Sequence, residues 1–150
     1  MPEAGSVHLS KKLFKLTMGG GMVFWAATIV TSLLPIAAEY RAAYSGWSIQ
    51  TVWVASLPMG MIIGYGVSWF LLRYFDMIPS KNPMLKSVII TFIALIIAVI
   101  LIDVPQGFFG MRNSGDALHY FFIGVLLNGG RFLLLGIGIG YLYREPADSL

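Results

Sequence analysis

Arg131 and Asn128 are the two residues whose types and spacing most clearly permit chemistry in this sequence. Arg131 is the sole charged residue in the apolar stretch 117–143, and Asn128 precedes it by three positions. Residues three apart lie on one face of a helix, so a guanidinium and an amide could contact one anionic or polar ligand. A charge within hydrocarbon usually faces a bundle interior, a wet cavity or another chain, which makes this pair the first candidate site.

The depth of Arg131 in a membrane determines which partners it can have. As a helix, 117–143 rises about 40 Å, which exceeds a hydrocarbon core of about 30 Å and places Arg131 near the midplane. The acidic residues belong to predicted loops and ends, so none is expected at that depth. Hydroxyl groups on the three other predicted helices are the available neutral partners: Thr28 and Thr31 on the first, Ser56 on the second and Thr91 on the third. Of these, Thr28, Thr31 and Ser56 form the predicted ligand-binding set with Arg131 and Asn128.

Three interpretations of Arg131 remain open at this point. The favoured one is structural, because carbonyl and hydroxyl groups in the bundle, or an acid of a neighbouring subunit, could satisfy the guanidinium. The second is a site for an anion or polar solute. In the third, the side chain extends toward a membrane surface, or the helix is displaced.

The sequence Asn128-Gly129-Gly130 leaves two alternatives for the last helix. Two adjacent glycines weaken a helix, an Asn-Gly pair favours a turn, and broken helices often line ligand sites in transporters. Each half would nevertheless be too short to span a membrane, and glycine in membrane helices commonly permits close packing. We therefore favour a continuous helix.

The composition is that of a membrane protein. Hydrophobic residues make up 57% of the chain, charged residues 11%, and the mean hydropathy is +0.78. An ordinary soluble domain carries about 25% charged residues. A chain of this length has room for about four membrane crossings. We expect a single domain, 1–150, in an integral membrane protein of the plasma membrane.

Apolar runs and helix-ending residues predict the elements that position these side chains. Asn82 suits a helix N-cap and Pro83 the first helical position, where no backbone donor is needed. Pro35 and Pro58 fall inside the first two predicted helices, and each removes one backbone donor. The fold class is therefore all-α, an integral membrane four-helix bundle. The four helices are expected at about 16–38, 49–72, 83–102 and 117–143.

Basic residues predict the orientation of the bundle. Most Lys and Arg residues lie near the termini or in the loop between the second and third helices. Short cytoplasmic segments are enriched in Lys and Arg, so we expect both termini in the cytoplasm. Lys11, Lys12 and Lys15 precede the first crossing and could also contact anionic membrane lipids, although an orientation signal alone explains them.

Glycine spacing predicts close contacts between helices. The pairs Gly60 and Gly64, and Gly136 and Gly140, form small-x-x-x-small faces that let backbones approach within the bundle or between subunits. The segment 64–69 also resembles 136–141, which leaves open whether the two helical hairpins are an internal repeat.

Polar residues in the outer loops and at the outer helix ends form a second candidate group. They are Glu39, Arg41, Asp103, Arg112, Asp116 and His119. Loops are ordinarily polar, so we favour a solvated outer rim over an enzyme site. His8 and His119 are expected on opposite sides of the membrane, and the sequence has no cysteine. We predict no catalytic residue, metal site, cofactor or nucleic-acid partner.

The leading functional interpretation is a small non-enzymatic multi-pass membrane protein, either a homo-oligomer or an accessory subunit of a partner membrane protein. The main alternative is a small transporter or channel that binds an anionic or polar solute near Arg131. A weaker alternative is a lipid-processing membrane enzyme that uses the outer rim.

Overall fold

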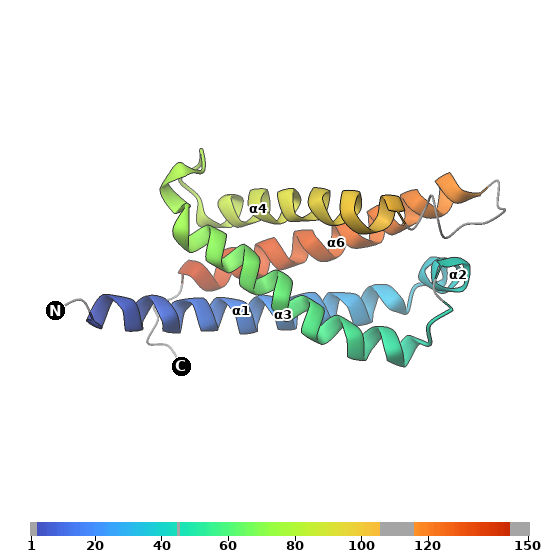
Figure 1. Ribbon diagram of the computed structural model, residues 1–150, viewed down its shortest axis with the longest axis horizontal. Coiled ribbons are helices and arrows are strands. Elements are labelled where there is room, and N and C mark those ends of the chain that lie inside the picture. The colour runs from blue at the N-terminus through green and yellow to red at the C-terminus, as the bar shows by residue number, and fades with distance from the viewer. Residues whose placement is uncertain (1–2, 45, 106–115, 145–150) are drawn as a thin grey trace.

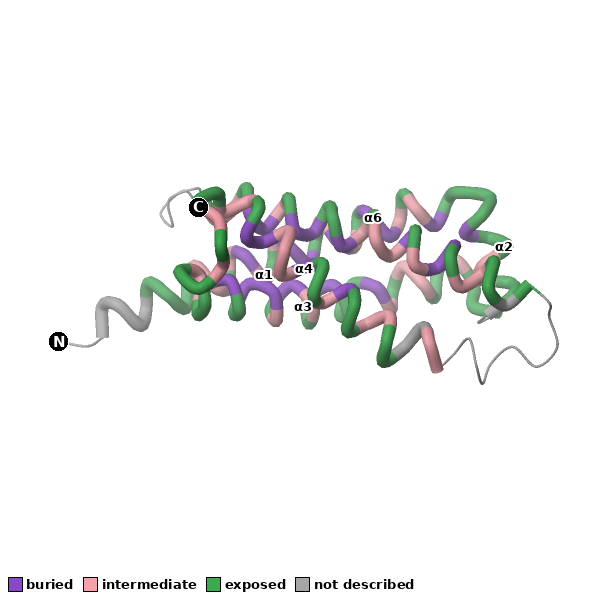
Figure 2. Tube along the Cα trace, turned by 90° about the horizontal axis from the view of Figure 1, so that it is seen from above, coloured by how far each residue is buried: buried purple, intermediate pink, exposed green. Residues whose placement is uncertain are grey.

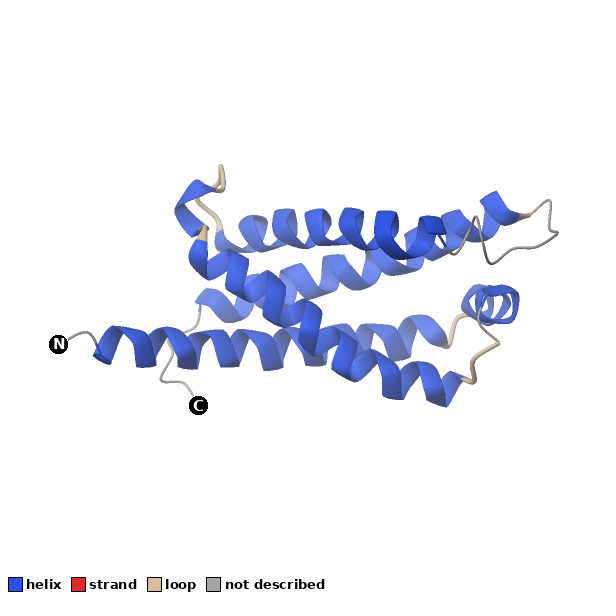
Figure 3. Cartoon of the chain, viewed as in Figure 1, coloured by secondary structure: helices blue, strands red, loops and turns tan. Residues whose placement is uncertain are grey.

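The described part of the chain, residues 3–44, 46–105 and 116–144 of a computed structural model, is built from helices (Figure 1). The elements are α1 (Glu3–Ser32), α2 (Pro35–Tyr44), α3 (Ile49–Arg73), the 3-10 turn η1 (Phe75–Met77), α4 (Pro83–Ala98), the π-helical turn η2 (Val99–Asp103) and α6 (Ala117–Arg144). The cartoon in Figure 3 shows these helices with short loops between them. The predicted all-α fold class is confirmed.

Four helices are long and apolar enough to cross a membrane. Their candidate spans are His8–Ser32, Ile49–Arg73, Pro83–Leu101 and Leu118–Arg144. The start of α1 and the end of α6 lie at one end of the bundle, and α2 lies across the opposite end (Figure 1). We call this opposite end the α2 end. The chain is thus a small multi-pass membrane protein.

α1 and α6 form the centre of the bundle. α1 packs on both α3 and α6, and α4 packs on α6, whereas α3 and α4 touch each other much less. In Figure 1, α3 crosses the bundle obliquely and shares with α4 only part of its length. Because α3 and α4 have few contacts with each other, a groove opens between them at the surface of the bundle.

The first helix differs from the expected range 16–38. α1 already begins at Glu3 and ends at Ser32, and Pro35 is the first residue of α2 rather than an interior residue of the first helix. The proline ring has no N–H and clashes with a preceding helical turn, but it fits the first position of a new helix. The carbonyl of Thr31, which would lose its donor if Pro35 continued the first helix, accepts a hydrogen bond from the Leu34 N–H at 3.2 Å.

The other helix boundaries lie close to the predicted ones. The side chain of Asn82 accepts a hydrogen bond from the Met84 N–H at 3.0 Å, and Pro83 opens α4 as expected. α3 continues through Pro58. α6 is continuous through 128–130, so the favoured alternative for the last helix is confirmed.

The glycine faces are used inside the bundle. A Cβ atom at Gly60 would lie 2.9 Å from the Gly21 carbonyl oxygen, which shows how closely α3 approaches α1. A Cβ atom at Gly136 would lie 2.9 Å from the Val88 Cα on α4. Such contacts between backbones are typical of membrane helices, where small residues permit dense packing. These faces are therefore internal helix contacts.

α4 buries polar side chains and exposes apolar ones, which is typical of a membrane helix. Its buried residues include Lys86, Ser87 and Thr91, whereas Ile93 and Ile96 are exposed. Figure 2 shows the same arrangement along the bundle, with buried residues between the helices and exposed residues outside. Lipid solvates an outward isoleucine but not a polar group, so inward polar side chains bonded to neighbours are favoured. Lys86 is buried and donates a hydrogen bond to the Phe75 carbonyl.

Two apolar clusters fill the interior. The main one is formed by Leu16, Phe24, Val67, Leu71, Leu95, Phe132, Leu135 and Ile139. The smaller one joins Ala37 of α2 to Ile123 and Leu127 of α6, with Tyr40 and Tyr120 against it. The smaller cluster fixes α2 across the end of the bundle, next to the residues that surround Arg131.

Candidate polar cavity around Arg131

The Arg131 guanidinium is held by two neutral oxygens. Its Nε donates a hydrogen bond to Thr31 Oγ1 on α1 at 2.8 Å, and one terminal nitrogen donates to Asn128 Oδ1, one turn earlier on α6, at 3.2 Å. The Asn128 contact confirms that residues three apart share this face of the helix. Arginine has five N–H donors, so these two bonds with described residues leave three for other contacts.

Arg131 is midway along α6 but lies toward the α2 end of the neighbouring helices. Its partner Thr31 is the penultimate residue of α1. The neighbouring Gly129 faces Leu95, which is about 18 Å of helix rise from Pro83 and about 9 Å from Leu101. The candidate span of α6, Leu118–Arg144, is centred on Arg131, and its midplane depth stays a prediction.

A cavity of about 200 Å³ lies next to Arg131. Its polar lining residues come from three helices: Thr28 on α1, Ser56 on α3, and Asn128 and Arg131 on α6. Four of the five residues in the predicted ligand-binding set therefore line one space. The fifth, Thr31, holds the guanidinium. Ligand binding by this set stays a prediction, but the side chains are together.

The hydroxyl groups of the cavity donate to their own helices. Thr28 Oγ1 donates to the Phe24 carbonyl at 2.9 Å, and Ser56 Oγ donates to the Trp53 carbonyl at 3.0 Å. A hydroxyl that has donated its proton still has lone pairs, so both oxygens can accept hydrogen bonds from a ligand or from water. The cavity thus combines guanidinium donors with neutral acceptors.

Arg41 of α2 lies close to the same region as Arg131. The Arg41 guanidinium donates a hydrogen bond to the Ser32 carbonyl at 2.9 Å, at the last residue of α1. Thr31, which accepts a hydrogen bond from Arg131, directly precedes Ser32. Two guanidinium groups therefore approach the turn between α1 and α2.

A pair of tryptophans, which sequence reasoning missed, supports this region. Trp53 Nε1 donates to Ser32 Oγ at 2.7 Å, and Trp25 Nε1 donates to the Trp53 carbonyl at 2.9 Å. A buried indole N–H generally needs a partner, which was the available signal. Nothing in the residue pattern distinguished Ser32 from other possible acceptors for Trp53. These bonds join α1 and α3 beside the cavity.

The predicted outer rim stays a prediction. Glu39, Asp116 and His119 are exposed, and Arg41 bonds to the end of α1. The side chain of Asp103, and the whole of Arg112, lie outside the described residues. Within the described residues, no group of three or more metal-binding side chains occurs.

The three amino-terminal lysines are part of α1. Lys11 is exposed, and Lys12 Nζ lies 3.7 Å from the centre of the Tyr143 ring on α6. This cation–π contact joins the start of α1 to the end of α6. Contact of these lysines with anionic lipids stays a prediction.

Comparison of this chain with protein-family models, with curated proteins and with solved structures finds no match. The geometry of the cavity and its surroundings is therefore the basis for assigning a function.

Proposed function

We propose that this small membrane protein is a non-enzymatic binder of an anionic solute or headgroup, as a small transporter or channel would be, with the cavity around Arg131 as its site. One observation carries the proposal: polar residues of α1, α3 and α6 line a single cavity of about 200 Å³ beside a guanidinium. The described partners of that guanidinium are neutral oxygens. An anion in the cavity would supply the missing negative charge.

The chemistry of arginine supports an anion over a neutral solute. A guanidinium presents N–H donors in a planar fork that matches the oxygens of a carboxylate or phosphate. Charge-assisted hydrogen bonds are stronger than neutral ones, and a site away from bulk water strengthens them further. The Thr28 and Ser56 hydroxyls donate to their own helices, so they would contact a bound anion through water rather than directly.

The interpretation as an oligomeric or accessory subunit has less support. The glycine faces that could have bound another subunit pack against α1 and α4 of the same chain. Assembly into a homo-oligomer or with a partner subunit stays a prediction, as does the plasma membrane location. The outer rim offers no comparable support for a lipid-processing enzyme, since its described residues are mostly exposed.

Thermal unfolding of the purified protein in detergent tests this proposal. Inorganic phosphate is the probe, and the variant is Arg131→Gln, which keeps a polar side chain but removes the charge. A ligand that binds only the folded state at 100 times its dissociation constant stabilises it by about 2.7 kcal/mol. We expect phosphate to raise the melting temperature of the wild type more than that of Arg131→Gln.

Arg73→Gln is the matched control, since Arg73 is an exposed arginine in the last turn of α3. Phosphate also stabilises proteins without a specific site, by exclusion from their surface. That general effect should be equal in all three proteins. An equal phosphate shift in the wild type and Arg131→Gln would contradict the proposal.

A further inference from the structure

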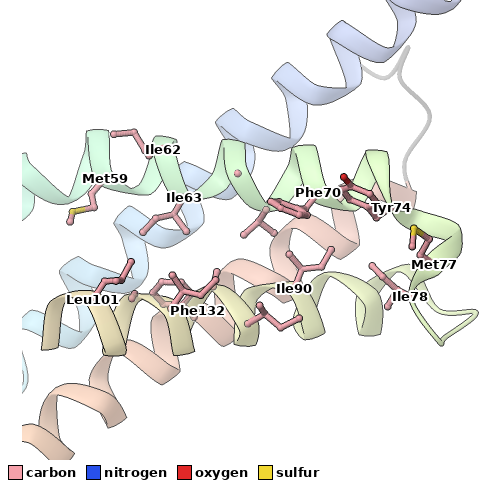
Figure 4. A pocket seen from close by; sticks show the side chains of 16 residues that line it. Met59, Ile62, Ile63, Phe70, Tyr74, Met77, Ile78, Ile90, Leu101 and Phe132 are labelled. Atoms are coloured by element: carbon pink, nitrogen blue, oxygen red, sulfur yellow. The ribbon is translucent and has the colours of Figure 1, made fainter. Parts of the chain in front are cut away.

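A second, larger cavity is the groove between α3 and α4, with a volume of about 720 Å³. Its lining is apolar apart from the Tyr74 side chain, and includes Ile63 and Phe70 of α3 and Ile90 and Ile97 of α4. Figure 4 shows side chains of both helices pointing into this space, with Phe132 of α6 at its floor. We call it the α3–α4 groove. It results from the limited contact between the two helices.

The α3–α4 groove adjoins the polar cavity around Arg131. Four residues line both spaces: Met59, Ile63, Ala98 and Phe132. Phe132 directly follows Arg131 in the chain, and its ring packs edge-on against Phe24 with the ring centres 5.7 Å apart. The polar cavity and the α3–α4 groove therefore lie next to each other within the bundle.

The groove has the length of an acyl chain and opens sideways. From Met59 to Tyr74 the lining helix rises about 22 Å, whereas the hydrocarbon of one leaflet is about 15 Å deep. Ile62 on one edge is 72% exposed and Ile93 on the other is 53% exposed. A molecule in the surrounding lipid could therefore enter between α3 and α4 without unfolding either helix.

We infer that the bound anion is the headgroup of an anionic membrane lipid, with one acyl chain in the α3–α4 groove. This inference rests on the proposed function and names its ligand class. The headgroup accepts hydrogen bonds from Arg131, and the chain runs from the shared junction toward Tyr74. The positive charge of Arg131 determines where the lipid headgroup binds. The lining residues that the two cavities share determine the direction in which the acyl chain runs.

A lipid fits the groove better than a helix of a partner protein. An apolar helix of a partner could cover the groove, but it would not supply a negative charge to Arg131, whose described partners are neutral oxygens. The headgroup of an anionic lipid supplies that charge while its chain occupies the groove. Bulk lipid is as apolar as the groove, so a bound chain gains little over its surroundings. Selection must therefore come from the headgroup at Arg131.

Lipid retention measured by native mass spectrometry tests the inference. The full chain is taken from bilayers that contain equal amounts of phosphatidylglycerol and phosphatidylcholine. Both headgroups carry an ionised phosphate, but the choline cation of phosphatidylcholine offsets that charge and would be repelled by Arg131. We therefore expect the wild type to retain phosphatidylglycerol about tenfold over phosphatidylcholine. Arg131→Gln should remove this preference and also the phosphate-induced rise in melting temperature.

Gly66→Leu tests the groove separately from the charge. Gly66 lines the groove, and a Cβ atom there meets nothing within 4 Å, so a leucine fills the space without a backbone clash. Gly130→Leu is the control, because Gly130 is equally open but lines neither cavity. We expect Gly66→Leu to lower phosphatidylglycerol retention toward that of phosphatidylcholine, because the leucine occupies the space of the acyl chain. It should keep the phosphate effect, and Gly130→Leu should change neither.

The outcomes separate the lipid inference from the proposed function. Equal retention of both lipids by the wild type, or unchanged retention in Gly66→Leu, overturns the lipid inference. If phosphate still stabilises the wild type through Arg131 in that case, the proposed function stands. The absence of both the lipid preference and the Arg131-dependent phosphate effect overturns the two together.

Discussion

Arg131 Nε and Thr31 Oγ1 lie 2.8 Å apart, although the two residues are one hundred positions apart in the chain. This hydrogen bond connects the middle of α6 to the last turn of α1, beside the turn that leads into α2. It fixes both the depth and the direction of the guanidinium. The cavity, the groove and the proposed ligand all depend on this placement.

Thr31→Val should destabilise the protein and weaken phosphate binding. Valine keeps the shape of threonine but removes the acceptor, so one N–H of Arg131 loses its partner. We expect the free energy of unfolding to fall by about 1 to 2 kcal/mol. Unfolding in mixed detergent and denaturant measures this change.

Thr17→Val is the control on the same helix. Thr17 Oγ1 is buried, and no hydrogen-bond partner for it occurs among the described residues. Removal of a buried, unsatisfied hydroxyl should leave stability unchanged or raise it. If Thr17→Val cost as much as Thr31→Val, the destabilisation would come from the shape change and not from the hydrogen bond to Arg131.

Gly136→Ala should increase the distance between α6 and α4 and lower the stability of the protein. The added Cβ would lie 2.9 Å from the Val88 Cα, so the backbones must move apart, at about 1 to 3 kcal/mol. At Gly129 the nearest atom, Leu95 Cδ2, would lie 3.9 Å away, which is an ordinary contact. Gly129→Ala should therefore stabilise α6 by about 1 kcal/mol. A loss of stability in Gly129→Ala similar to that in Gly136→Ala would contradict the described helix packing.

Trp53→Phe should weaken the contact between α1 and α3. It removes the indole donor that bonds to Ser32 Oγ, and we expect a loss of about 1 kcal/mol. Trp69 contacts the rings of Phe70 and Tyr74 of its own segment, so Trp69→Phe should change stability by less than about 0.5 kcal/mol. Thermal unfolding of the two variants under one set of conditions compares these losses.

Single cysteines can test the predicted orientation, because the natural sequence has none. Ser10 near the start of α1 and His119 at the start of α6 are both exposed. With the termini in the cytoplasm, a membrane-impermeant thiol reagent applied to intact cells should label His119→Cys and not Ser10→Cys. Labelling of Ser10→Cys alone would reverse the orientation.

The sequence was sufficient to predict the helices and the residues around Arg131. A lone arginine in an apolar run needs polar neighbours, and few polar residues occur in the other apolar runs, so Thr28, Thr31 and Ser56 were natural candidates. Polar groups inside a membrane pair with one another because other partners are scarce there, so these three residues are expected near Arg131.

The position of Arg131 relative to α1 and the α3–α4 groove could not be predicted in this way. The position depends on Pro35, which begins a new helix across the bundle instead of kinking the first one. The groove depends on the oblique path of α3, which the close approach of Gly60 to Gly21 on α1 helps to set. Apolar periodicity identifies helices, but it carries little information on their relative angles.

The most direct measurement is the NMR signal of the Arg131 side-chain Nε–H during a titration with phosphate in detergent micelles. Charge-assisted hydrogen bonds to an anion should shift this signal in a saturable way, while those of the exposed Arg73 and Arg144 change little. An Arg131 signal that does not move, or that moves only as much as the two surface arginines, would contradict anion binding in the cavity.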